Sequence, residues 1–210
     1  MAAVDKPAGL LVHPTYEAKD RVTCMNLLRN ELGCWVYPAH RLDRGTSGVV
    51  LFGLSGQVAA ALQACFRERT VEKVYQAIVR GYIAESGEVE RALDGQPAQT
   101  SWRVLERFEL PDAVGPFASV RYSLVELRPR TGHRHQLRRH MRGLNHPILG
   151  DTRHGDSDHN RYARSAHRFE RMALAARRLA LPHPSSREPL VLEAPLAGEI
   201  EELLVRLRGC

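Results

Sequence analysis

The sequence predicts an α+β fold built on a mixed, mostly antiparallel sheet that is flanked by helices and loops. Segments with the two-residue alternation of strands are interrupted by segments with helical spacing, without the regular strand–helix alternation of a parallel sheet. No internal repeat and no Gly/Ser-rich or Pro-rich linker divides the 210 residues, of which 43% are hydrophobic. A single domain over residues 1–210, with a core of its own, is therefore expected.

Capping residues mark where the helices begin and end. Thr23 begins a helix that runs to Leu32 and is stopped by Gly33. Ser55 begins a second helix, whose inner face follows the spacing i, i+3, i+4, i+7 at Val58, Ala61, Leu62 and Cys65. Three more are expected: near His135 with Leu137, Met141 and Leu144 inside, over residues 158–170, and at the end with Ile200, Leu203, Leu204 and Leu207 inside.

Short apolar or alternating runs indicate the strands. The run Val49–Phe52 is uniformly apolar, which is typical of a strand buried on both faces. Residues 117–127 alternate instead, with Val120, Tyr122 and Leu124 inward and Arg121 outward. The other expected strands are Val74–Val79, Thr100–Phe108, Arg177–Leu181 and Leu190–Glu193. The chain opens close to its first motif, so the sequence leaves open whether a further strand precedes it.

The charge distribution suggests a polyanionic partner. Thirty basic residues against 24 acidic ones give a net charge of +6. The excess is uneven, because residues 121–178 hold fourteen arginines and five acidic residues, whereas residues 182–210 hold three arginines and five glutamates. Such a basic face can bind nucleic acid by releasing counterions. The alternative is that the arginine-rich composition merely reflects a GC-rich genome.

Composition also argues against other classes of protein. The longest apolar runs, such as Gly48–Leu54, are too short to cross a bilayer, and the first residues do not form a secretory signal. A cytoplasmic protein without membrane contact is therefore expected. The cysteines (Cys24, Cys34, Cys65 and Cys210) form no paired motif, so we expect reduced thiols and not a disulfide framework or a zinc site.

The segment from His40 to Gly48 carries the strongest chemical signal. Its one carboxylate, Asp43, stands between Arg41 and Arg44, and a Gly/Thr/Ser/Gly turn then leads into an apolar strand. Nearby guanidinium groups favour an ionised carboxylate, as a nucleophile or base requires. The alternative is a structural aspartate that caps the turn while the arginines remain solvated.

Four segments resemble the motifs of the RluA-type pseudouridine synthase family, in the order in which that family has them. HRLDRGTSGVVLFG, from His40, resembles its catalytic motif, and VDKPAGLLVHPT, from Val4, its N-terminal motif. KVYQAIVRG, from Lys73, resembles its tyrosine motif, and HQLRRHM with HPILGDTRHG, from His135, its third motif. Together they extend over about three-quarters of the chain.

This resemblance implies a catalytic domain whose sheet is split by an RNA-binding cleft, without a separate N-terminal RNA-binding module. Asp43 would act as the carboxylate on a uridine that has left its stack, either by attack on C1′ or through a glycal. No cofactor or metal is implied. The segments 150–161 and 175–184 resemble the branch that modifies tRNA, which implies a uridine-65-type site. The alternatives are a ribosomal-RNA substrate and a non-catalytic RNA-binding protein on the same scaffold.

The resemblance also assigns roles to two further positions. Tyr75 would stack on the uracil and help to remove the C5 proton. The family's Gly-Arg-x-His-Gln pattern has an arginine that pairs with the catalytic carboxylate, but this chain has His133 in that position. A protonated His133, a shifted Arg134 or a substituting Arg138 could fill the role, and the sequence leaves all three open.

The remaining polar residues divide into RNA contacts and structural groups. Lys6 and His13 are expected near the same cleft, and Thr46 and Ser47 are expected to hold the Asp43 turn. The spacing of His133, His135 and His140 fits no known metal motif, so no metal site is predicted. A remote alternative is a metal-dependent nuclease or phosphatase, which a chelator would inactivate and which would use Asp43, Asp151, Asp156 and Asp158. No obligate protein partner is expected, and the protein is expected to be a monomer. The candidate phosphate contacts are Arg138, Arg139, Arg142, Arg153 and Arg161.

Overall fold

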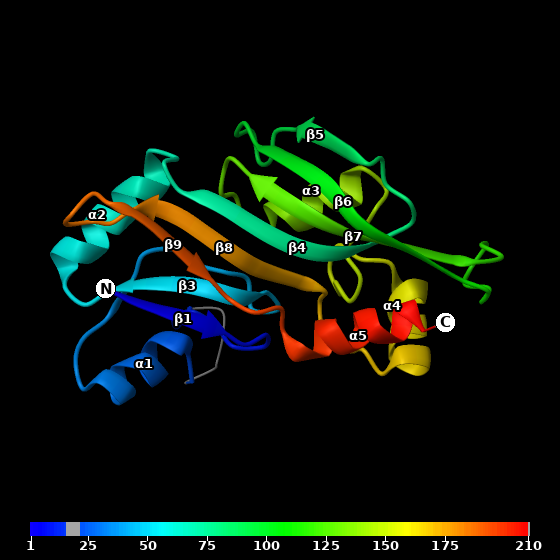
Figure 1. Ribbon diagram of the computed structural model, residues 1–210, viewed down its shortest axis with the longest axis horizontal. Coiled ribbons are helices and arrows are strands. Elements are labelled where there is room, and N and C mark those ends of the chain that lie inside the picture. The colour runs from blue at the N-terminus through cyan, green and yellow to red at the C-terminus, as the bar shows by residue number, and fades with distance from the viewer. Residues whose placement is uncertain (16–21, 210) are drawn as a thin grey trace. The chain divides into compact units, whose positions relative to one another are not determined.

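The computed structural model describes residues 1–15 and 22–209. It contains two compact units: Met1–Lys73 with Ala176–Pro195, and Val74–Ala175 with Leu196–Cys210. Helices and mostly antiparallel strands alternate irregularly along the chain, which confirms the predicted α+β class (Figure 1). No helix within the described residues is long and apolar enough to span a membrane.

The first unit is organised around strand β3 (Ser47–Gly53), in which all seven residues are buried. Antiparallel β1 (Ala2–Lys6) and the short β2 (Tyr37–Pro38) both pair with β3. In the strand order, β3 stands between β1 and β8 (Leu174–Pro182), and β8 also pairs with β9 (Pro189–Glu193). The core of this unit contains apolar residues from these strands and from one helix, among them Val49, Leu51, Leu62, Cys65 and Leu179.

Both helices of the first unit begin where their capping residues predicted, and α1 also ends at its predicted stop. In α1 (Cys24–Leu32), the Thr23 side chain accepts a hydrogen bond from the backbone N–H of Asn26, and Gly33 closes the helix with φ of 63°. In α2 (Gly56–Arg67), the Ser55 side chain accepts from the backbone N–H of Val58. Helix α2 packs on β2 and β3.

The second unit contains four antiparallel strands in the order β4 (Glu72–Arg80), β7 (Val120–Pro129), β6 (Gln99–Leu110) and β5 (Ser86–Glu90). Strand β7 is largely buried on both faces, because its neighbouring residues enter different cores. Tyr122 and Leu124 of β7 belong to one cluster, whereas Val125 and Leu127 belong to the other. Arg121 is exposed, as its alternation with apolar neighbours predicted.

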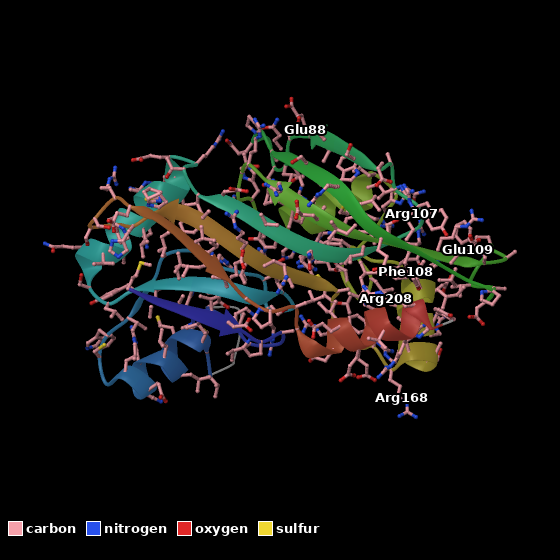
Figure 2. All side chains as sticks on the ribbon, viewed as in Figure 1. Glu88, Arg107, Phe108, Glu109, Arg168 and Arg208 are labelled. Carbon is pink, nitrogen blue, oxygen red and sulfur yellow. The ribbon has the colours of Figure 1, made fainter. Side chains whose placement is uncertain are left out.

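Three helices cover this sheet. Helix α3 (Gln136–Gly143) contributes Leu137 and Met141 to the second cluster, and α4 (Ser157–His167) contributes Ala163 to the first. The last helix, α5 (Gly198–Arg208), adds the four apolar residues that its spacing predicted, Ile200, Leu203, Leu204 and Leu207. It packs against β6, where Phe108 lies in the same core and Arg208 Nη2 pairs with Glu106 Oε2 at 2.7 Å (Figure 2).

The sequence missed three strands and misplaced some ends. Strands β1, β2 and β5 were not expected, because they are short and their alternation is weak. Strand β7 begins at Val120 and not at residue 117, after a bridge between Val114 and Phe117. Helix α4 ends at His167, before the expected residue 170, because Arg168 adopts the left-handed conformation with φ of 52°. Cys210 lies outside the described residues.

A substitution at Gly48 tests this fold. Its φ is +110°, and a Cβ there would lie 2.0 Å from the Ala176 carbonyl oxygen. We expect Gly48→Ala to lower the free energy of unfolding by about 2–5 kcal/mol, because backbone strain and overpacking add. Urea denaturation of the purified variants measures the loss. The control is Gly56→Ala, because a Cβ at Gly56 meets nothing within 4 Å. Equal stability of the two variants would contradict the prediction.

Candidate active site

The Asp43 carboxylate is presented by a tight turn at the start of β3. The backbone N–H of Thr46 donates to the Asp43 carbonyl at 3.1 Å, which closes the turn. Thr46 and Ser47 are only 2% and 3% exposed, and Leu42 on the other side is also buried. Asp43 itself is half-buried, between the exposed Arg41 and Arg44. Thr46 and Ser47 thus lie within the turn that they were predicted to hold, while Asp43 keeps access to solvent.

The N-terminal loop is clamped to this turn through the backbone of Arg44. The backbone N–H of Gly9 donates to the Arg44 carbonyl at 2.8 Å, and Arg44 Nε donates back to the Gly9 carbonyl at 2.9 Å. The Lys6 side chain is fully buried, and its Nζ donates to the carbonyls of Pro7, Leu10 and Arg44 at 2.8, 2.8 and 3.3 Å. Lys6 therefore ties together the backbone beside Asp43. His13 bonds locally, with Nδ1 2.8 Å from the Pro14 carbonyl oxygen.

His40 anchors the chain on the other side of Asp43, a role that the sequence did not reveal. Its Nε2 accepts a hydrogen bond from the backbone N–H of Leu51 at 3.1 Å, and its ring stacks on Phe66 at 4.5 Å. Burial, together with the charge of Lys73, lowers the pKa of His40 to about 4. Burial and the Arg69 charge lower the pKa of Lys73 to about 8. A neutral His40 accepting from β3 fixes where the segment before Asp43 meets the sheet.

Tyr75 lies on β4, the strand in which the family's tyrosine motif was expected. Its backbone is in register with Leu127 of β7. The half-buried ring packs against the cluster that contains Val125, Leu127 and Met141. The apolar body of the ring is thus supported by the core of the second unit.

The segment before α3 is fixed by the buried Gln136. Its Oε1 accepts from Thr131 Oγ1 at 2.7 Å and from the backbone N–H of His133 at 3.1 Å, and its Nε2 donates to the Gln99 carbonyl at 2.9 Å. His135 precedes the helix with a left-handed φ of 56°. His133 Nε2 lies 2.9 Å from the Pro97 carbonyl oxygen. His133 is therefore held by a neighbouring loop.

Arg138, a predicted phosphate contact, forms a buried ion pair. Its Nε donates to Asp151 Oδ2 at 2.6 Å and its Nη2 to Asp151 Oδ1 at 2.8 Å. The side chains are 10% and 0% exposed. Burial alone would raise the pKa of Asp151, but hydrogen bonds from Arg138 and from the backbone N–H groups of His154 and Arg153 hold it below its usual value. One sequence signal was available: Arg138 falls three residues before Met141, on the inner face of α3.

The other candidate phosphate contacts are more exposed. Arg139 forms a two-fold pair with Asp94, which is 74% exposed, at 2.8 and 3.0 Å. Arg134 and Arg153 are also exposed. Two of the predicted contacts, Arg142 and Arg161, line one open cleft of about 550 Å³ in the second unit, with Arg164, Asp151, Asp156 and Asp158 also in its wall. Because its charges are mixed, this cleft alone does not define an anion site.

No group of three or more potential metal ligands comes together within the described residues. The closest imidazole pair is His135 and His154, with Nδ1 of the first 3.0 Å from Nε2 of the second. His140 is directed elsewhere: its Nδ1 lies 2.9 Å from Thr100 Oγ1.

The environment of His40 predicts a pH dependence of stability. Because its folded pKa of about 4 lies below the ordinary value of 6.5, the unfolded chain binds a proton more readily between these values. The free energy of unfolding should therefore fall as the pH drops from 6.5 to 4, by at most about 3 kcal/mol from this residue. In urea denaturation at several pH values, His40→Gln should flatten this fall, because glutamine can accept the Leu51 hydrogen bond without titrating. An unchanged slope would contradict the assignment.

Comparison with known proteins shows to which family this chain belongs. A family model described as RNA pseudouridylate synthase matches residues 1–142. tRNA pseudouridine synthase C of Vibrio cholerae is 44% identical over 213 residues, covering 93% of this chain and 87% of that protein. The protein of the same name from Pectobacterium carotovorum is 44% identical over 211 residues, covering 92% of this chain; the chain spans only 56% of its length.

Two solved human structures are also similar. Human RNA Pseudouridylate Synthase Domain Containing 4 has a TM-score of 0.74 at 28% identity, covering 98% of this chain and 89% of its own. Human RNA Pseudouridylate Synthase Domain Containing 1 has a TM-score of 0.68 at 25% identity, covering 96% and 95%. The family match includes the Asp43 turn, the Tyr75 strand and Arg138. This chain belongs to the RNA pseudouridylate synthase family.

Proposed function

We propose that this protein converts a specific uridine of tRNA to pseudouridine, at a uridine-65-type position. Membership of the family supports the isomerase activity, and relatives named tRNA pseudouridine synthase C at 40–44% identity support tRNA as the substrate. The observation that carries the proposal is the Asp43 turn, because it presents one carboxylate, between two arginines, directly before a fully buried strand.

In the proposed reaction, the uracil N1–C1′ bond breaks and a C5–C1′ bond forms. The Asp43 carboxylate either attacks C1′ or removes a ribose proton to give a glycal, and it is regenerated when the base rejoins through C5. The proton lost from C5 is balanced by the proton gained at N1, so the isomerisation requires no external group and no redox cofactor. A stacked uridine must leave its helix for this chemistry, so the substrate base is flipped.

We assign two roles to Tyr75. Its ring, supported by the core behind it, offers a flat surface on which the flipped uracil stacks. Its hydroxyl assists removal of the C5 proton in the last step, as the matching motif position implies.

Of the three candidates for the role of the family's motif arginine, we propose Arg138. His133 is bonded to the Pro97 carbonyl, and Arg134 is exposed. Arg138 is buried and held by two hydrogen bonds on one edge of its guanidinium, which is the arrangement that fixes a cation for catalysis. It is charged at every working pH, whereas an imidazolium is not.

Phosphate contacts are proposed for the exposed arginines. They position RNA without reading its sequence. Arg139 can join them, because its pair with the exposed Asp94 is screened by solvent and easily exchanged for a phosphate. The proposed enzyme acts in the cytoplasm as a monomer and without an obligate protein partner. The exposed set is Arg41, Arg44, Arg134, Arg142, Arg153 and Arg161.

Substitution of the proposed catalytic carboxylate tests the function. In a strain that lacks this protein, pseudouridine mapping of total tRNA and ribosomal RNA should show one tRNA uridine that is no longer modified. Wild type should restore it and Asp43→Asn should not, because an amide can neither attack C1′ nor act as the base. RNA affinity of the variant should stay within a few-fold of wild type, since phosphate contacts dominate binding.

The control is Glu201→Gln, the same chemical change on the exposed face of α5, which should restore the modification fully. If the unmodified uridine lies in ribosomal RNA, the proposed tRNA substrate is wrong. If it is a different tRNA uridine, the proposed position is wrong. Substantial turnover by Asp43→Asn would contradict the mechanism. If the protein only binds RNA without converting it, its absence from the strain would leave every pseudouridine site unchanged.

The two roles of Tyr75 can be separated by removing the hydroxyl alone. Tyr75→Phe keeps the ring and should bind RNA normally, but turnover should fall roughly 10²–10⁴-fold because the proton acceptor is lost. Tyr75→Leu should lose turnover and also weaken binding of a short substrate hairpin. Single-turnover rates and filter binding distinguish the two effects. Tyr37→Phe, at an exposed position in the first unit, is the control. Full activity of Tyr75→Phe would remove the hydroxyl from the mechanism.

A further inference from the structure

The Asp151 carboxylate is enclosed by hydrogen-bond donors from two segments. Oδ2 accepts from Arg138 Nε at 2.6 Å, and Oδ1 accepts from Arg138 Nη2 at 2.8 Å. Oδ1 also accepts from the backbone N–H groups of Arg153 and His154, both at 2.9 Å. The side chain has no exposed surface. Two of these four bonds come from a loop and two from α3, so the carboxylate joins the loop to the helix.

The backbone that carries Asp151 is fixed independently of Arg138. Asn160 of α4 accepts from the Gly150 N–H at 2.7 Å and donates to the Asp151 carbonyl at 2.9 Å. Gly150 has φ of +77°, and a Cβ there would lie 1.8 Å from the Arg171 carbonyl oxygen. The position of the carboxylate is therefore set by the surrounding chain, and Arg138 must adapt to it.

This arrangement fixes the plane and direction of the Arg138 guanidinium. The two bonds through Nε and Nη2 occupy one edge of the planar guanidinium group, and they thereby also fix the direction of Nη1. We infer that Asp151 is a positioning residue, which holds Arg138 in the orientation that its proposed role in the reaction requires. The inference rests on the proposed function and extends it to a residue that does not touch the substrate.

A merely structural role is the competing explanation. Burial of an ion pair costs desolvation of both charges, and apolar residues of similar volume often stabilise a fold as well or better. A buried ion pair therefore adds little net stability to the fold. A guanidinium that must be both charged and immobile, however, requires a buried carboxylate partner of this kind. The two explanations differ in whether loss of Asp151 changes the chemical step or only the free energy of unfolding.

The second unit also contains a comparable pair, whose arginine, Arg80, lies in the segment KVYQAIVRG. Asp156 accepts from the backbone N–H groups of Asp158 and His159 at 3.0 and 3.1 Å and pairs with Arg80 Nη1. Like Asp151, Asp156 thus accepts hydrogen bonds from two backbone N–H groups and pairs with one arginine. Arg80, however, has no role in the proposed reaction. Asp156→Asn therefore reports what such a carboxylate contributes to folding alone.

The test is a double-mutant cycle with Asp151→Asn and Arg138→Lys, read as single-turnover rate and KM on a tRNA substrate. Asparagine keeps an acceptor for the two backbone N–H groups but loses the charge that aligns Arg138. We expect the rate of Asp151→Asn to fall roughly a hundredfold, as small misplacements at a reacting centre do, with KM changed less than about threefold. The double variant should be no slower than the slower single variant, because both changes disable the same group. Asp156→Asn should lower the thermal midpoint, and its rate should fall far less than that of Asp151→Asn.

Two results would overturn the inference: a rate for Asp151→Asn within about threefold of wild type, or losses that multiply in the double variant. If Asp151→Asn does not fold, Asp151→Glu is measured instead. It keeps the charge and shifts the carboxylate by one methylene, and it must show the same loss of rate with KM retained. Wild type without activity on any tRNA would refute the proposed function instead, so the two failures are distinguishable.

Discussion

The close approach of Gly48 to the Ala176 carbonyl is the constraint on which the Asp43 turn depends. Only a residue without Cβ fits there, and its φ of +110° directs the chain from the turn into a fully buried strand. The turn is then held from outside by the reciprocal Gly9 and Arg44 bonds. Asp43 can therefore stay half exposed, because the backbone on each side of it is fixed by contacts that do not involve its carboxylate.

The protein uses three different means of keeping polar groups inside. The Lys6 ammonium is surrounded by backbone carbonyls, which replace the water that it loses. His40 stays neutral at physiological pH and acts as an acceptor for the sheet. Asp151 and Arg138 stay charged and share two hydrogen bonds. The first two hold the backbone beside Asp43, and we infer that the third orients a group used in the proposed reaction.

Much of the fold could be predicted from local signals. The caps Thr23 and Ser55 and the stop at Gly33 were correct because a cap is decided by a few neighbouring residues. Strands β1 and β5 were missed because neighbouring residues alone do not predict them. Their half-exposed residues acquire strand geometry by pairing with β3 and β6, and β-propensity depends strongly on such partners.

The sequence by itself determined the family, the α+β class and the residues of the Asp43 and Tyr75 motifs, since these depend on residue identity and order along the chain. Only the tertiary structure decided what each charged group contacts. Arg138 and Arg139 are neighbours in sequence, yet one is buried against Asp151 and the other meets the exposed Asp94. A rotation of about 100° per residue around a helix separates an inner from an outer face. What lies opposite each face is set by segments distant in sequence, which no local pattern specifies.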